Sequence, residues 1–301
     1  FSKIFKYFYH SILEVSPNSN LIVSWNEYQP KFTFHLQNDS RIKFPKISEK
    51  YLEKVLLKYK INKEFIGLHS RNNLFLKKNK IVDPNFHDFR NFDFEDYDLA
   101  IRYLSKKNIS IIKLGETYDE EKIKLKFPNV ITSQDFNSDQ EIDYILNSYS
   151  KFNVIGNSGV SGISSISRKP IIYINLIPLN LNNLSYCSPG SLILPKKMYN
   201  KEKKKFLSFK ENININFDIH SAKNPYEINN LSVVNNSNSE VLNAIIEMEK
   251  IVSNQEDLET KNLNDMFWKS ISSNNNEKIN YLKNVLKLTI SKNFLKENQN
   301  L

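Results

Sequence analysis

The sequence has little cysteine, glycine and arginine, and each shortage excludes a class of protein. Only one of its 301 residues is a cysteine, Cys187, so neither a disulfide framework nor a multi-cysteine zinc site is expected. Six glycines, against a usual share of about 7%, exclude collagen-like and linker-like content. No apolar run approaches the roughly 18 residues of a membrane-spanning helix. With 40% hydrophobic residues, the chain is expected to form one large or two medium soluble domains.

The net charge of +9 has a compositional explanation. Only five of the 42 basic residues are Arg, and the chain holds 42 Asn, a bias typical of low-GC genomes. Arg is the commoner reader of bases, so nucleic acid is not expected as a partner. Since the chain shows no export signal and its one cysteine is free, we expect a cytoplasmic location.

Short apolar runs alternate with amphipathic segments through the middle of the chain. Strands are predicted at 65–69, 109–114, 130–131, 152–155 and 171–174. Helices are predicted at 48–59, 93–104, 120–126, 139–149, 160–167 and 239–252. Such alternation predicts an α/β fold with a Rossmann-like parallel sheet and right-handed crossovers.

The two ends of the chain differ from this middle. The run Phe1–His10 is basic and aromatic, and an amphipathic core helix is favoured there over a membrane-surface helix. Residues 280–296 keep helical periodicity in Asn-rich surroundings. We therefore divide the chain into a short or incomplete N-terminal domain (1–60), a Rossmann-like domain (61–252) and a helical, low-complexity extension (253–301).

Polar residues follow the predicted strands at the edge where parallel sheets bind ligands. In chain order they are His69 and Arg71, then Gly115 and Glu116, then the turn 156–162, then Asn175. The guanidinium fork of Arg71 suits a diphosphate, since it can hold two phosphate oxygens. His69 lies on the same face of the extended segment and either donates to a substrate or is a satisfied core residue.

The turn 156–162, GNSGVSG, holds three of the six glycines and allows two interpretations. Ahead of a helix, its backbone N–H groups and hydroxyls would bind an anion. Alternatively, the glycines serve only the packing of a tight turn. The residues predicted to contact substrate here are Gly156, Asn157, Ser158, Gly159 and Ser161.

Two further clusters also allow two interpretations. Arg90 and Asn91 either line the cleft or belong to a surface ion-pair network with Asp88. The lysine-rich run 196–210 is either a solvated face or a contact with anionic lipid or a phosphorylated acceptor. The lysines proposed for that contact are Lys196, Lys197, Lys203, Lys204 and Lys205.

The order of these motifs resembles a bacterial glycosyltransferase family. The segments that carry the likeness, between residues 20 and 250, are GLHSRN, DFRNFDFEDYDLAIRYL, a strand ending in KLG, DQEIDYILNSYSKFNVIGNSGVSG, RKPIIYINLIP and NSEVLNAIIEM. That family is similar to the GT-B, O-fucosyltransferase-like enzymes, whose H-x-R element opens the nucleotide-sugar domain. The resemblance implies that Arg71 contacts the donor diphosphate and that Asn157, Ser158 and Gly159 hold its phosphates or ribose.

The resemblance and the residues together predict transfer of a sugar from a nucleotide diphosphate donor to a glycan or lipid-linked acceptor, in cell-surface polysaccharide synthesis. Arg71 would stabilise the leaving diphosphate, with His69 and Glu116 as further catalytic residues. The acceptor's base is sought among Glu27, Asp88 and Glu116. No D-x-D motif joins a strand to a loop, so no metal or other cofactor is expected.

Two alternatives stay open at this point. One is a non-catalytic nucleotide- or glycan-binding module of the same fold. The other is a protein that binds polyanions or membrane surfaces, with the α/β core as scaffold. A location at the inner face of the membrane fits both the enzyme and this last alternative.

Overall fold

The computed structural model describes residues 47–73, 77, 87–115, 120–215, 217, 224–255, 258–272 and 276–298. Its strands are β1 (Phe65–His69), β2 (Ser110–Lys113), β3 (Val130–Ile131), β4 (Asn153–Ile155), β5 (Ile171–Leu176), β6 (Leu192–Pro195), β7 (Lys197–Asn200), β8 (Lys205–Phe206), β9 (Leu231–Val234) and β10 (Thr289–Ile290). Its longer helices are α3 (Glu49–Lys58), α5 (Asp98–Lys106), α6 (Glu120–Lys126), α7 (Gln140–Tyr149), α12 (Asn238–Val252) and α13 (Leu258–Ser270). The predictions for Phe1–His10, Glu27 and Glu116 lie outside the described residues.

Shorter helical segments connect these elements. They are η1 (Asp88–Arg90), η2 (Phe94–Tyr97), η3 (Ser133–Phe136), α8 (Ser161–Ile166), α9 (Leu181–Leu184), α10 (Phe209–Ile213), α11 (Pro225–Ile228), α14 (Asn276–Asn280), the π-helical turn η4 (Tyr281–Val285) and α15 (Lys292–Glu297).

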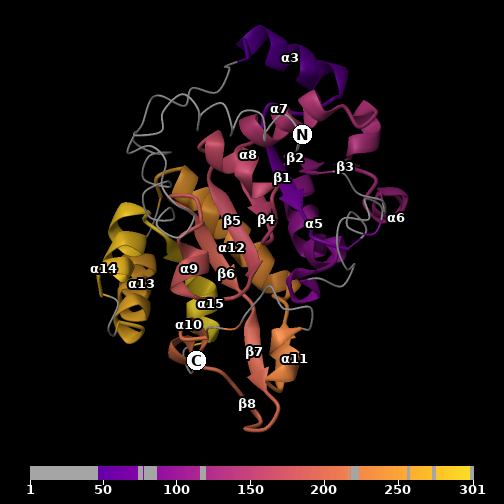
Figure 1. Cartoon of the computed structure of the whole chain (residues 1–301). Coiled ribbons are helices and arrows are strands. Elements are labelled where there is room, and N and C mark those ends of the chain that lie inside the picture. Colours follow the sequence, from indigo (N-terminus) through magenta and orange to yellow (C-terminus); the bar gives the residue numbers. More distant parts are fainter. Residues whose placement is uncertain are drawn as a thin grey trace, which may run out of the picture.

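Seven strands form one parallel sheet in the order β10-β6-β5-β4-β1-β2-β3 (Figure 1). Without its outermost strand β10, this is the 3-2-1-4-5-6 order of a Rossmann fold. β1 and β4 are neighbours, with Leu68 opposite Val154. The apolar runs predicted as strands are confirmed, and β1, β4 and β5 are buried along their whole length. The predicted Rossmann-like α/β fold is therefore correct.

Local signals in the sequence explain where several helices begin. The Ser48 side chain caps α3 by accepting a hydrogen bond from the Tyr51 amide, and Asp139 caps α7 by accepting one from the Glu141 amide. Two predicted helices begin differently in the structure. Asp93, the first residue of the predicted helix 93–104, precedes η2 without a capping hydrogen bond, and α12 begins at Asn238, one residue earlier than predicted, because Ser237 and Glu240 form a capping box.

A second, three-stranded sheet of order β8-β7-β9 lies beside α11 at one end of the molecule (Figure 1). It packs on its own small core, whose buried members are Phe89, Ile177, Met198, Leu207, Tyr226 and Leu231. Phe89 comes from η1, and its ring lies 4.9 Å from that of Tyr226. The small sheet thus fixes the segment that follows residue 87.

The C-terminal residues are mostly helical, as expected, but they are not a detached appendage. β10 pairs with β6 and extends the main sheet, and Leu282, Leu286 and Ile290 are fully buried. The helical periodicity seen over 280–296 in the sequence is therefore interrupted by a strand. The boundaries proposed at residues 60 and 252 stay predictions.

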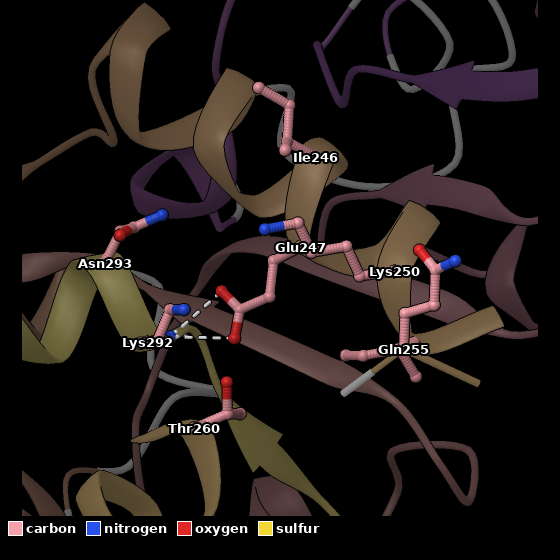
Figure 2. A pocket seen from close by; sticks show the side chains of 8 residues that line it. Ile246, Glu247, Lys250, Gln255, Thr260, Lys292 and Asn293 are labelled. Carbon is pink, nitrogen blue, oxygen red and sulfur yellow. Dashed lines mark hydrogen bonds between the residues drawn. The ribbon is translucent and has the colours of Figure 1, made fainter. Parts of the chain in front are cut away.

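A small cavity of about 30 Å³ marks the contact between α12 and α15 (Figure 2). The Glu247 carboxylate accepts hydrogen bonds from the Ser291 hydroxyl at 2.8 Å and from the Lys292 amide at 2.9 and 3.0 Å. These contacts place a carboxylate at the N-terminus of α15, where the helix dipole favours negative charge. They join the C-terminal helix to the core, and the cavity is too small for a substrate.

None of the helices in the described part of the chain is long and apolar enough to cross a membrane.

Candidate functional site at the switch point of the sheet

The strand order reverses between β1 and β4, and open α/β sheets bind ligands beyond the strand ends at such a point. From β1 the chain continues to β2 and β3 on one side, and from β4 it continues to β5 and β6 on the other. Because the crossovers leave in opposite directions, the ends of β1 and β4 border a crevice. The segments that start at His69 and at Gly156 both lie there.

Three side chains join these two strand ends. The His69 Nδ1 lies 3.4 Å from the Ser158 hydroxyl oxygen, although 89 residues separate the two. The Tyr97 hydroxyl lies 2.9 Å from the His69 carbonyl oxygen and 3.2 Å from that of Val154. The ends of β1 and β4 are thus joined through His69, Ser158 and Tyr97.

The His69 imidazole is neutral at physiological pH. Burial lowers its pKa to about 3, and the nearby charges of Lys113 and Arg71 act in the same direction. A neutral imidazole has one N–H donor and one acceptor nitrogen. His69 can therefore offer a hydrogen bond at the crevice but brings no charge to it.

Arg71 is oriented by the segment around η1. Its Nη1 donates to the His87 carbonyl oxygen at 3.0 Å and to the Asn91 side-chain oxygen. The Asn91 amide nitrogen donates to Asn73 Oδ1 at 2.7 Å and to Asp88 Oδ1 at 3.2 Å. Asn73 also donates to Asp88, so that four side chains form one network. Burial lowers the pKa of Arg71, and the Asp88 carboxylate opposes that effect.

This network borders a hollow of about 350 Å³, which we call the Arg71 hollow. Its lining consists of Arg71, Asn72, Asn73, Lys77, Asn91, Phe92, Asp93 and Asn235. A second hollow of about 390 Å³ shares Asn91 and Asn235 with it and also contacts Asp88 and Lys196. The two hollows therefore share part of their walls. These walls carry both cations and carboxylates, namely Arg71, Lys77, Lys196 and Lys201, and Asp88, Asp93 and Glu227.

Two more cations stand close to Arg71. Burial and the Arg71 charge lower the pKa of Arg90 to about 10, and the Arg90 guanidinium lies 5.7 Å from the Phe89 ring centroid. Within the described chain, Arg90 Nε has no hydrogen-bond partner and Arg90 forms no ion pair with Asp88. Lys196 is 3% exposed, and its Nζ donates to the carbonyl oxygens of Phe89 and Asn91, both at 2.9 Å. These three cations would attract an anionic ligand, and the nearby carboxylates of Asp88 and Asp96 oppose that attraction.

The glycine turn after β4 is closer to its packing interpretation. A Cβ on Gly156 would lie 2.3 Å from the Phe92 ring, whereas a Cβ on Gly159 meets nothing within 4 Å. Neither glycine has a positive φ. Gly156 therefore lets Phe92, which lines the Arg71 hollow, pack against the strand end.

The polar side chains of the same turn are partly used inside the protein. The Asn157 amide nitrogen donates to the Ile177 carbonyl oxygen at 2.8 Å, and the Ser161 hydroxyl donates to the Ser158 carbonyl oxygen at 2.8 Å. Helix α8 is six residues long and has no side-chain cap. Residues 156–161 are not part of the lining of the Arg71 hollow; the turn borders it indirectly, because Gly156 packs against Phe92, which lines the hollow.

Asn175 has a structural role. It is fully buried, its amide donates to Asn236 Oδ1, and its Oδ1 accepts from the Asn236 amide, both at 2.7 Å. The pair ties the end of β5 to the loop before α12. The expected contact of Asn175 with a substrate is not supported, because the pair encloses the side chain.

Two of the five lysines expected at a membrane surface are not available for it. Lys196 is buried as described, and Lys197 forms an ion pair of 2.8 Å with the buried Glu240. Lys203, Lys204 and Lys205 are exposed at the β7–β8 hairpin, which extends from the end of the molecule in Figure 1.

Sequence reasoning missed Asn73, Lys196 and Asn235 as neighbours of Arg71. Asn73 could have been recognised from the sequence, because it lies two positions after Arg71 in the same polar segment after β1. Lys196 is hidden in a lysine-rich run, and only its place directly after the apolar strand LILP distinguishes it. Asn235 gives no signal that separates it from the other asparagines.

No protein-family model and no curated protein matches the sequence. Among solved structures, the chain is similar to an E. coli ADP-heptose lps heptosyltransferase II, with 12% identity and a TM-score of 0.43. The match covers 70% of this chain and 54% of that one, so this chain spans about half the length of that protein. A resemblance at this level carries no information about activity.

Proposed function

We propose that the protein transfers a sugar from a nucleotide diphosphate donor to a glycan or lipid-linked acceptor. The observation that carries the proposal is the position of Arg71, which is oriented by Asn91 at the β1–β4 switch point. Breaking the bond between sugar and phosphate leaves negative charge on the diphosphate. A guanidinium fixed before the reaction stabilises that charge without reorganisation.

The neighbouring residues support the same chemistry. Arg90 and Lys196 add positive charge, and neutral His69 adds a hydrogen-bond donor beside Ser158. Asp88 borders the second hollow and is, among the three acidic residues considered as the acceptor's base, the one that the structure describes. The proposal involves no metal, and cell-surface polysaccharide synthesis is its biological setting.

A thermal-shift series with nucleoside diphosphates tests the proposal, because a ligand that binds only the folded state raises its stability. We expect one or more of them to raise the melting temperature of the wild type. The shift should be lost in Arg71→Ala and kept in Arg102→Ala, whose exposed guanidinium pairs with Asp98. Absence of any shift, or an equal shift in Arg71→Ala, contradicts the proposal.

Turnover separates the enzyme from a binding module of the same fold. The nucleotide that binds is supplied as its sugar derivatives, and release of nucleoside diphosphate is followed with and without glycan acceptors. The enzyme releases it in the wild type at least tenfold faster than in Arg71→Ala. Binding without release from any donor tried supports the non-catalytic module.

We further propose that the β7–β8 hairpin contacts anionic lipid. Lys203, Lys204 and Lys205 project there with Phe206, which is 39% exposed and lies against Tyr199. Near an anionic surface each basic residue contributes about 1 kcal/mol, so the three together are expected to give about a hundredfold preference for anionic vesicles.

Replacing the three lysines by Gln should abolish co-sedimentation with phosphatidylglycerol vesicles. The same change at Lys50, Lys54 and Lys58 of α3 is the control, and equal losses in both variants contradict the hairpin contact.

A further inference from the structure

We propose that Lys196 is the positioning residue of the Arg71 site: its ammonium group holds the segment 88–91 in the conformation in which Asn91 orients Arg71. The ligand in this inference, an anion bound at Arg71, rests on the proposed function. The contacts that connect Lys196 to Arg71 do not depend on that function. Lys196 lies between β6 and β7, and it contacts the segment 88–91 through the carbonyl oxygens of Phe89 and Asn91.

The contacts form a short chain from Lys196 to Arg71. The Lys196 ammonium donates to the carbonyl oxygens of Phe89 and Asn91, both at 2.9 Å, and so fixes the backbone on either side of Arg90. The Asn91 side chain accepts from Arg71 Nη1, and the Phe92 amide donates to the Arg71 carbonyl oxygen at 3.1 Å. Removing the ammonium leaves two carbonyl groups without their donor next to the residue that orients Arg71.

The hydrogen bonds of the Lys196 ammonium group are important energetically because the group is buried. Lys196 is 3% exposed, and lysine is almost never fully buried unless it is paired. Burial lowers its pKa to about 8, the Asp96 carboxylate opposes this, and the Arg71 charge adds to it. Lys196 thus stays cationic at neutral pH, and its hydrogen bonds to the carbonyls are charge-assisted.

A structural lysine and a positioning lysine differ in their pH behaviour. An anion on Arg71 is bound more tightly while Lys196 is protonated, so affinity falls as pH rises through about 8. The other groups facing this region whose pKa is shifted do not titrate near pH 8. His69 is already neutral, with a pKa of about 3, Arg90 has a pKa of about 10 and loses only part of its charge toward pH 9.5, and burial raises the pKa of Tyr226.

The contribution of Lys196 to global stability changes in the opposite direction over the same range. The folded pKa of Lys196 lies below that of the unfolded chain, so unfolded molecules bind the extra proton and this contribution to the free energy of unfolding rises between about pH 8 and 10.5. Deprotonation of Lys196 therefore does not itself unfold the protein in this window.

The first measurement uses no ligand. Hydrogen exchange of the peptide that contains residues 88–92 is compared in the wild type, Lys196→Met and Lys169→Met. Lys169 is also partly buried, and burial lowers its pKa. It lies before the first residue of β5, however, whereas Lys196 follows the last residue of β6. We expect at least tenfold faster exchange in Lys196→Met and unchanged exchange in Lys169→Met. Urea unfolding checks that Lys196→Met folds. If the folded variant exchanges this peptide at the wild-type rate, the inference is overturned.

The second measurement is the affinity for inorganic pyrophosphate and for ADP, GDP and UDP between pH 7 and 9.5. Relative to Lys196→Met, we expect wild-type affinity to fall about tenfold across this range. Lys196→Met should bind weakly, with a pH dependence that reflects only the titration of the ligand itself. Arg71-dependent binding with the same pH profile in wild type and Lys196→Met overturns the inference and leaves the proposed function intact. If none of the four binds the wild type, the proposed function fails, and the exchange measurement still decides whether Lys196 holds the segment.

Discussion

Gly156 illustrates how a single contact determines a residue in this site. Its position against the Phe92 ring leaves no room for a methyl group, whereas Gly159, three residues later, faces open space. Alanine at each of the two positions therefore tests whether a glycine is needed for packing or merely occurs in a glycine-rich turn.

We predict that Gly156→Ala lowers the free energy of unfolding by about 1–3 kcal/mol, because overpacking displaces Phe92. Gly159→Ala should stay within about 0.5 kcal/mol of the wild type. Urea unfolding of the two variants measures both values. Equal stabilities would show that Phe92 does not occupy this position.

A second residue-scale prediction concerns the charge of His69. Its folded pKa of about 3 lies below the unfolded value of about 6.5, so the neutral ring stabilises the fold above pH 6.5 and this contribution is lost as pH falls toward 3. In NMR spectra the ring should keep neutral-state shifts from pH 8 to 4.5, with His69→Gln identifying its signals.

Between pH 7 and 4.5, His69→Gln should also lose about 2 kcal/mol less stability than the wild type. A His69 ring that titrates near pH 6.5 would contradict the buried, neutral state.

Residue identities near the strand ends could be predicted in part from the sequence. His69, Arg71 and Asn91 could be proposed as site residues, because their residue types and their positions at a strand end or in a turn can be read from the sequence. Lys196 could not be recognised, because the contact that buries it joins positions 105 and 107 residues away along the chain. Asn175 was misassigned for the same reason, since its partner Asn236 lies 61 residues away.

At the scale of elements, buried strands were the clearest signal. β1, β4 and β5 are covered on both faces, and continuous apolar runs follow from that burial. β10 escaped prediction because it has two residues and sits inside a helical pattern. Its pairing is specified by tertiary contacts, chiefly those of Asn264 in α13.

We predict that Asn264→Ala destabilises the protein by about 1–3 kcal/mol. Its side chain accepts from the Ile290 amide at 2.7 Å and donates to the Ile290 carbonyl oxygen at 2.9 Å, so the change leaves two buried backbone groups of β10 unpaired. Asn262→Ala, at an exposed position of the same helix, is the control and should be neutral or slightly stabilising. Thermal or urea unfolding of the pair tests whether β10 belongs to the cooperative core.

At the scale of the whole molecule, strand order brings the site together. The turns after β1 and β4 are far apart in the sequence and meet because the order reverses between these two strands. Lys196, which directly precedes β7, and Phe89, which packs in the core of the small sheet, then attach the segment 88–91 to that sheet. The alternation of strands and helices predicts the first part of this arrangement, but the second part depends on a sheet that the sequence did not reveal.

A crystal structure of the protein with the nucleoside diphosphate that gives the largest thermal shift tests the central claim most directly. The account predicts phosphate oxygens about 3 Å from the Arg71 guanidinium, at the ends of β1 and β4, with Asn91 still accepting from Arg71. A nucleotide bound elsewhere on the protein, with Arg71 more than a hydrogen-bond length from any phosphate oxygen, would contradict it.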